Sequence, residues 1–170
     1  MLELVVVFGL PFLLVTASAT DFLEMTIPNW IPTLLIIIFL ALSPFIGLTF
    51  VEIAWHFAAA LIVFSACFAL FAINVMGGGD AKLLTSLALW YGFDSSLIQL
   101  LAYTGYLGGL LTVSIILLRA NWDKLATVGI RLPETMMAAR KIPYAIAIGA
   151  AGLLTYPNSP LFVAAIHNMP

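Results

Sequence analysis

The sequence has very little charge. Of its 170 residues, 64% are hydrophobic and only 8% are Asp, Glu, Lys or Arg, whereas about 25% of a typical soluble domain is charged. So few charged side chains cannot cover a globule in water, which excludes a soluble protein. A disordered chain is excluded too, because disordered segments are polar and rich in charge. No basic face is available to meet phosphates, so nucleic acid is not an expected partner.

Cysteine and histidine are also scarce. The single cysteine, Cys67, excludes an internal disulfide and any CxxC motif, and its apolar surroundings indicate a small buried hydrophobe. The two histidines, His56 and His167, lack the spacing to partners that a metal site needs. We therefore expect no metal and no cofactor.

Long apolar runs are what the sequence does contain, and they predict helices that cross a lipid bilayer, because a spanning helix needs about 20 apolar residues. Six runs are candidates: Leu2–Ala19, Trp30–Phe50, Ala54–Met76, Lys82–Phe93, Leu97–Leu118 and Ile142–Tyr156. The fourth and sixth are short, so full crossing by these two stays open. The sequence predicts an all-α polytopic membrane protein with about six transmembrane helices, in a single domain over residues 1–170.

Two local features refine this expectation. Pro44 and Gly47 are expected to kink the second helix. The four tryptophans lie near predicted helix ends, as in an aromatic belt at the membrane interfaces; they are Trp30, Trp55, Trp90 and Trp122.

The basic residues predict the orientation, because positively charged loops stay in the cytoplasm. Lys82 lies between the third and fourth runs, and all other basic residues lie between the fifth and sixth: Arg119, Lys124, Arg131, Arg140 and Lys141. With six spans, these two loops and the loop after the first span share the cytoplasmic side, and both termini are non-cytoplasmic. The stretch from Arg119 to Lys141 fits an interfacial amphipathic helix or a solvated loop equally well.

Two acidic residues, Asp21 and Asp80, lie at helix ends on this predicted cytoplasmic face. Taken alone, Asp80 fits a helix N-cap after a glycine hinge, and Asp21 fits a hydrated interfacial acid. Taken together, they predict a catalytic pair, because two carboxylates in a partly dry site cannot both ionise freely. One then accepts a proton from water while the other donates to a carbonyl oxygen. Such a pair hydrolyses a peptide bond without a metal or a nucleophilic serine.

The residues around these two aspartates form two motifs. In the first, Asp21 is followed after five residues by Ile27-Pro28-Asn29, and in the second, Gly77-x-Gly79-Asp80-x-Lys82-Leu83 follows the third span. In this order and topology, the motifs resemble those of the type IV prepilin leader peptidases, which are intramembrane aspartyl proteases of the GxGD class. The resemblance implies that Asp21 and Asp80 are catalytic. It also implies a set of residues that shape the substrate site: Gly77, Gly79, Pro28, Asn29 and Lys82.

The resemblance further implies the substrate and the location. The substrate is a prepilin with a short basic leader, cut after a Gly at the cytoplasmic face of the bacterial inner membrane. The lack of paired CxxC motifs is typical of the short, peptidase-only form that serves Flp (tight-adherence) pili and has no methyltransferase portion. Pilus or secretion assembly proteins are further expected partners. Family members often carry basic residues after the first Asp, whereas this chain has Glu24, which we expect to attract a basic leader.

Two other functions were compared with this one. A small proton-coupled transporter subunit would use Asp21 and Asp80 as a proton relay, and it predicts acids at several depths along a path through the membrane. A non-catalytic scaffold for pilus assembly would use both aspartates only for structure. The nearly acid-free spans favour the peptidase over the relay.

Overall fold

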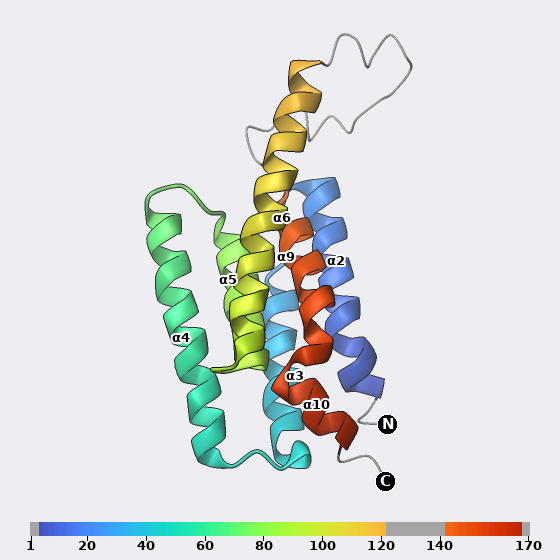
Figure 1. Ribbon diagram of the computed structural model, residues 1–170, viewed down its shortest axis with the longest axis vertical. Helices are drawn as coiled ribbons and strands as arrows, with labels where there is room; N and C mark the ends of the chain where they lie inside the picture. The colour runs from blue at the N-terminus through green and yellow to red at the C-terminus, as the bar shows by residue number, and fades with distance from the viewer. Residues whose placement is uncertain (1–3, 122–141, 168–170) are drawn as a thin grey trace.

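The computed structural model describes residues 4–121 and 142–167, and every regular element in these ranges is a helix (Figure 1). The all-α prediction is confirmed there. The elements are η1 (Val5–Gly9, a π-helix), α2 (Leu10–Glu24), α3 (Trp30–Ile46), α4 (Phe50–Ala72), α5 (Gly78–Tyr91), α6 (Ser95–Ala120), α9 (Tyr144–Thr155), η2 (Tyr156–Asn158, a 3-10 helix) and α10 (Pro160–His167). Trp122 and almost all of the stretch up to Lys141 lie outside the described residues, so the choice between helix and loop there stays a prediction.

Each of the six predicted apolar runs contains a helix in its described part, but these helices differ in their fitness to cross a membrane. Among the described residues, three helical stretches are long and apolar enough to span: Val5–Glu24, Phe50–Ala72 and Ser95–Ala120. A fourth span exists if Tyr144–Asn158 and Pro160–Ile166, which meet at an angle of 45°, count as one. Helix α3 has 17 residues and α5 has 14. The protein is therefore a membrane protein, with three or four span-capable segments in the part of the chain that the structure describes, and the count of six remains a prediction.

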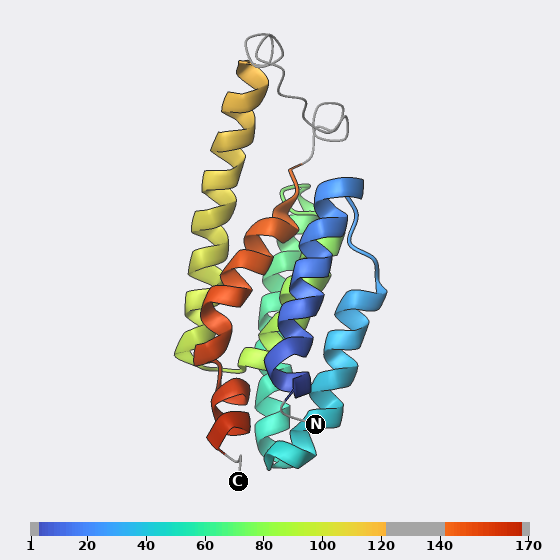
Figure 2. The same ribbon diagram turned by 90° about the vertical axis from the view of Figure 1, so that its right-hand side faces the viewer.

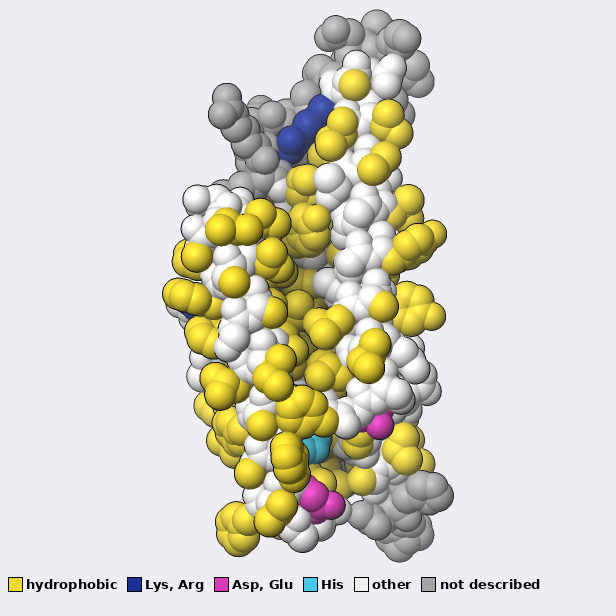
Figure 3. Space-filling view, turned by 60° about the vertical axis from the view of Figure 1, so that its left-hand side comes forward, with side chains coloured by type: hydrophobic (Ala, Val, Ile, Leu, Met, Phe, Trp, Pro, Cys, Tyr) yellow, Lys and Arg dark blue, Asp and Glu magenta, His cyan; other side chains and the backbone are white. Residues whose placement is uncertain are grey.

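The shortness of α5 has a structural reason. This helix contacts α3, α4, α9, α10 and α6, and its residues from Ser86 to Tyr91 are all buried. A helix that is enclosed by other helices does not contact lipid along its length, so it can be shorter than a helix that spans the bilayer. By contrast, α4 and α6 present a face covered with hydrophobic side chains, as expected for a lipid-facing surface (Figure 3).

Two expectations about individual residues differ from the structure. Gly47 ends α3, because it adopts a left-handed φ of 86° as the C-cap; Pro44 lies inside the last turn of the helix, and a kink at Pro44 stays a prediction. Trp90 does not belong to an aromatic belt, because it is fully buried and its indole Nε1 donates to the Leu35 carbonyl oxygen at 3.1 Å. Trp30 and Trp55 are exposed, as a belt requires.

The direction of the helices decides which residues share one end of the bundle. Helices α2, α4 and α6 run towards the end at which α5 and α9 begin (Figure 1). Helix α9 lies between α2 and α6, and it contacts both (Figure 2). The C-terminal end of α2 and the N-terminal ends of α5 and α9 therefore lie together at one end of the bundle, while α10 lies at the other.

Candidate active site

Asp21 lies in the last turn of α2, at the end of the bundle where α5 and α9 begin. Its side chain is only 7% exposed, and its Oδ2 accepts a hydrogen bond of 2.9 Å from the backbone N–H of Ala145 in the first turn of α9. The helix ends directly after it: Met25 is a left-handed C-cap with a φ of 53°, and its N–H donates to the Asp21 carbonyl oxygen. This sharp end turns the chain back into the loop that carries Ile27.

Asp80 lies in the first turn of α5, at the same end of the bundle, and is 9% exposed. The glycines before it allow its carboxylate to fold back over the start of the helix. A Cβ at Gly77, the N-cap, would lie 2.6 Å from Asp80 Oδ2. Any side chain at Gly77 therefore displaces the carboxylate, which is a physical reason for glycine at this position.

The two motifs contact each other, although they are far apart in the sequence. Gly79 lies against Ile27, because a Cβ at Gly79 would be 3.2 Å from the Ile27 Cβ. Three residues after Gly79 in α5, Lys82 Nζ donates a hydrogen bond of 2.9 Å to Asn29 Oδ1. The loop after Asp21 is thus held against the helix that begins with Asp80.

Pro28 and Asn29 begin α3. The Pro28 carbonyl oxygen accepts from the Ile31 N–H, and the Asn29 carbonyl oxygen accepts from the Thr33 N–H and hydroxyl. Asn29 is the N-cap residue, but its side chain makes no cap hydrogen bond. An N-cap asparagine usually bonds its own helix, whereas this one accepts from Lys82. The Asn29 side chain therefore links the start of α3 to α5 and does not cap its own helix.

One contact of the site involves a residue that was not predicted from the sequence. The N–H donor to Asp21 belongs to Ala145, and the Ala145 carbonyl oxygen accepts from Ser18 Oγ at 3.0 Å. A backbone donor leaves no mark on residue identity, so no motif reveals it. The remaining sequence signal is the pair of glycines in α9, Gly149 and Gly152, which permit close approach of another helix.

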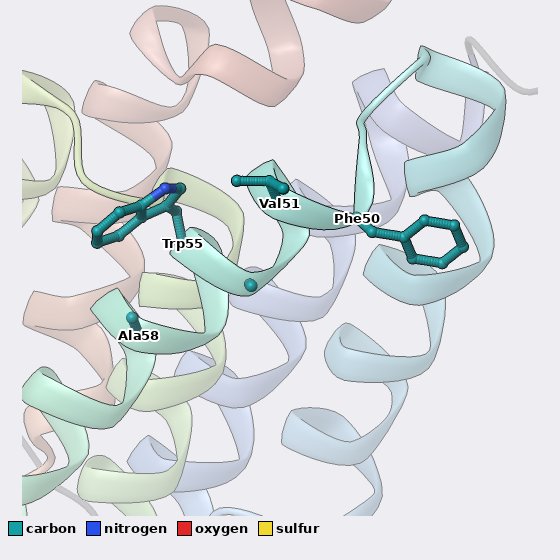
Figure 4. A pocket seen from close by; sticks show the side chains of 5 residues that line it. Phe50, Val51, Trp55 and Ala58 are labelled. Carbon is teal, nitrogen blue, oxygen red and sulfur yellow. The ribbon is translucent and has the colours of Figure 1, made fainter.

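Chemistry other than that of the aspartates has little support in the described part of the chain. No group of three or more His, Cys, Asp or Glu side chains there is arranged to hold a metal ion. A pocket of ≈ 500 Å³ lies at the start of α4 and is lined by Phe50, Val51, Ala54, Trp55 and Ala58 (Figure 4). It lies at the opposite end of α4 from Gly77–Gly79 (the glycine turn), so it is not part of the aspartate site.

Comparison with known proteins identifies a family. Residues 8–116 match the type IV leader peptidase family, and this match includes both motifs. No curated protein and no solved structure matches the chain. Helix α9, which supplies the donor to Asp21, lies outside the matched residues.

Proposed function

Because the chain belongs to the type IV leader peptidase family, we propose that it is an aspartyl endopeptidase that removes the leader of Flp-type prepilins with Asp21 and Asp80 as the catalytic pair. The observation that carries this proposal is the contact between the two motifs. The Lys82–Asn29 hydrogen bond and the packing of Gly79 on Ile27 join the loop after Asp21 to the helix that begins with Asp80.

The proposed reaction is hydrolysis by a bound water molecule. One carboxylate, in its ionised form, accepts a proton from water as the water oxygen bonds to the carbonyl carbon of the peptide. The other carboxyl group, in its neutral form, gives its proton to the carbonyl oxygen. When the tetrahedral intermediate collapses, the C–N bond breaks and the leaving nitrogen takes up the proton that came from water. One hydroxyl of the intermediate returns its proton to the second carboxylate as the carbonyl group re-forms. The pair ends with one proton, as it began, so no cofactor is consumed.

The burial of both aspartates supports these roles. At 7% and 9% exposure, the side chains of Asp21 and Asp80 have lost most of their hydration, and a carboxyl group that is partly dry keeps its proton more readily. A peptide that reaches this end of the bundle must have an accessible carbonyl group. We propose that the substrate lies extended beside the glycine turn, because helical peptide bonds are already hydrogen-bonded within the helix. A substrate that is locked in a helix at its cleavage site, and is still cut, contradicts this point.

The placement of charge supports a site that faces the cytoplasm. Lys82 in the first turns of α5 and Arg119 in the last turn of α6 lie at the same end of the bundle as the aspartates. Positively charged ends of spanning helices stay in the cytoplasm. On this proposal the active site faces the cytoplasm of a bacterial inner membrane, where the prepilin leader begins.

Glu24 supports a basic leader as the segment that is recognised. It ends α2, it is exposed, and it lies three residues after Asp21. We propose that its carboxylate attracts the leader's basic side chains. Glu24→Gln is then expected to raise KM for a basic leader without a change in kcat. Equal cleavage of a basic and a neutralised leader by wild type and by this variant removes Glu24 from recognition.

The test of the main proposal is cleavage in membranes of a small Flp-type prepilin by wild type, Asp21→Asn and Asp80→Asn. The N-terminus of the product is read by mass spectrometry, and the membrane level of each variant is measured. We expect wild type to cleave after the leader Gly and each variant to lose at least about 100-fold in rate. Normal cleavage by either variant contradicts the catalytic pair. Variants that fail to accumulate in the membrane point to the scaffold function in its place.

A further inference from the structure

The first turn of α9 is tied to α2 by two hydrogen bonds that meet at one residue. The Ala145 N–H donates to Asp21 Oδ2 at 2.9 Å, and the Ala145 carbonyl oxygen lies 3.0 Å from Ser18 Oγ, whose single proton it shares with the Leu14 carbonyl oxygen. Ser18 and Asp21 are three residues apart on α2, so they lie on the same face of that helix. The hydroxyl of Ser18 also lies 2.8 Å from the Leu14 carbonyl oxygen, which fixes its position against its own helix.

Close packing holds these two helices at a short separation. A Cβ at Gly149 would collide with Ser18 Oγ and would lie 3.3 Å from the Leu14 carbonyl oxygen, and a Cβ at Gly152 would lie 2.6 Å from Leu14 Cδ1. Glycine at these two positions therefore lets α9 approach α2 closely enough for the Ala145 backbone to reach Asp21. The close packing at the two glycines and the hydrogen bonds at Ala145 require the same alignment of α9 along α2.

The chemistry of this contact favours a charged carboxylate. A backbone N–H can only donate, so the Asp21 oxygen that it meets must accept. Ala145 also lies in the first turn of α9, where N–H groups have no partner within the helix and where negative charge is favoured. A donor in this position both orients Asp21 and stabilises its ionised form.

We propose that Ser18 is a positioning residue of the active site: it holds the first turn of α9 so that the Ala145 N–H orients Asp21 and favours the ionised form that accepts the proton of water. This inference rests on the proposed peptidase function. It extends the site to Ser18, which neither motif includes, and to α9, which lies outside the residues matched by the family.

The test is the pH dependence of prepilin cleavage by the purified full chain in lipid nanodiscs. Ser18→Ala removes the hydroxyl that holds Ala145. Ser65→Ala is the matched control, because the Ser65 hydroxyl donates to the Leu61 carbonyl oxygen within exposed α4 and contacts no site residue. We expect Ser18→Ala to lower kcat about threefold to tenfold, to leave KM unchanged and to move the acidic limb of the pH profile up by about half a pH unit. The control keeps the wild-type profile.

A second pair of variants tests the geometry. Gly149→Ala places a methyl group on Ser18 Oγ and pushes α9 away, so we expect a larger loss of kcat and a larger shift of the acidic limb. Ser18→Ala in addition to Gly149→Ala removes the colliding oxygen. The double variant is then expected to recover to the level of Ser18→Ala alone.

The possible outcomes separate this inference from the function on which it rests. If wild type cleaves the prepilin but Ser18→Ala keeps both the wild-type kcat and the wild-type acidic limb, the positioning role is wrong and the peptidase stands. A fall in kcat without movement of the acidic limb also overturns it, since that pattern indicates a general packing defect. If wild type cleaves no prepilin, the proposed function itself is wrong, and the role of Ser18 is wrong with it.

Discussion

Lys82 and Asn29 are 53 residues apart in the chain, yet Lys82 Nζ donates a hydrogen bond of 2.9 Å to Asn29 Oδ1. Each residue belongs to a different motif, and each motif carries one aspartate. Neither side chain is buried, so the bond adds little to the burial of apolar surface. Its effect is geometric, because it holds the beginning of α3 and the loop before it against the first turns of α5.

The first prediction concerns this pair. Lys82→Met and Asn29→Ala are each expected to lower kcat/KM for prepilin cleavage by roughly tenfold, because each removes one charge-assisted hydrogen bond. The double variant is expected to lose little more than either single variant, since both changes remove the same bond. Asn121→Ala is the matched control, because this exposed asparagine donates from its side-chain amide to the Leu117 carbonyl oxygen at the end of α6. Additive losses in the double variant show that the two side chains act independently.

The second prediction orders the three glycines before Asp80. Gly77→Ala places a Cβ 2.6 Å from Asp80 Oδ2, so we expect about a 100-fold loss of kcat from the displaced carboxylate. Gly79→Ala meets Ile27 at 3.2 Å and should cause a smaller loss. Gly78→Ala meets only the ring of Phe71 at 3.3 Å, an exposed side chain that can move, and it should be close to wild type. Cleavage rates measured at equal membrane levels test this order, and a Gly78→Ala variant as impaired as Gly77→Ala contradicts it.

The third prediction concerns His56, which we expect to stabilise the protein and not to act in catalysis. It is buried at the end of the bundle opposite the aspartates, and its Nδ1 lies 2.8 Å from the Leu89 carbonyl oxygen. Gly92, with a φ of 59°, lies against its ring, and a Cβ there would be 2.9 Å from ring atoms. His56→Ala and Gly92→Ala are each expected to lower the free energy of unfolding by about 1–3 kcal/mol.

Thermal unfolding in detergent, measured together with the cleavage rate, tests this prediction. Both variants should have a lower melting temperature, while the rate per folded molecule and its pH profile stay at wild-type values. Loss of activity in His56→Ala at an unchanged melting temperature contradicts a structural role and brings this histidine into the mechanism.

The fourth prediction is a pH dependence of stability at the start of α6. The Ser96 N–H donates to Asp94 Oδ2 at 2.7 Å, and this hydrogen bond lowers the pKa of Asp94 below its ordinary value. Because the folded pKa lies below the unfolded value of about 3.9, ionised Asp94 stabilises the folded chain above that pH. This stabilisation is lost as the pH falls through the folded pKa.

Asp94→Asn isolates this effect, because asparagine also caps helices but does not titrate. The unfolding free energies of wild type and Asp94→Asn are measured in detergent from pH 6 to about pH 2.5. Wild type should lose stability relative to Asp94→Asn as the pH falls. The other acidic groups protonate in both proteins and cancel in this difference. A difference that is independent of pH over this range means that Asp94 does not stabilise α6 through its charge.

Much of the fold could be predicted from the sequence, because apolar runs and helices coincide in a membrane protein. Each of the six runs contains a helix in its described part, and both motifs lie at the predicted helix ends. Tertiary context decided the rest. Trp90 fits an interfacial position by its place in the sequence, but α5 is enclosed, so its indole N–H finds the Leu35 carbonyl oxygen inside the protein. Gly47 ends α3 three residues after Pro44, so the predicted second run does not continue as one helix to Phe50.

The predicted site was less complete than the predicted fold. Asp21, Asp80 and the glycines follow from side-chain chemistry at recognisable spacing. The donor to Asp21 is a backbone N–H, which every residue except proline carries, so the identity of Ala145 holds no signal. Ser18 lies in an Ala-Ser-Ala run that is typical of small residues in many contexts. Its role depends on the register between α2 and α9, which single-sequence patterns do not contain.

The enclosure of α5 has a consequence for how the protein responds to its lipid. A change in bilayer thickness acts on helices that touch lipid, which respond by tilting or by deforming the membrane. Helix α5 touches mainly protein, so the depth of Asp80 is determined by its neighbouring helices. A substrate helix that is held only by lipid, in contrast, changes its depth or tilt when the bilayer thickness changes. On the proposed function, membrane thickness therefore changes which peptide bond of the substrate arrives at Asp80, while α5 keeps its place in the bundle.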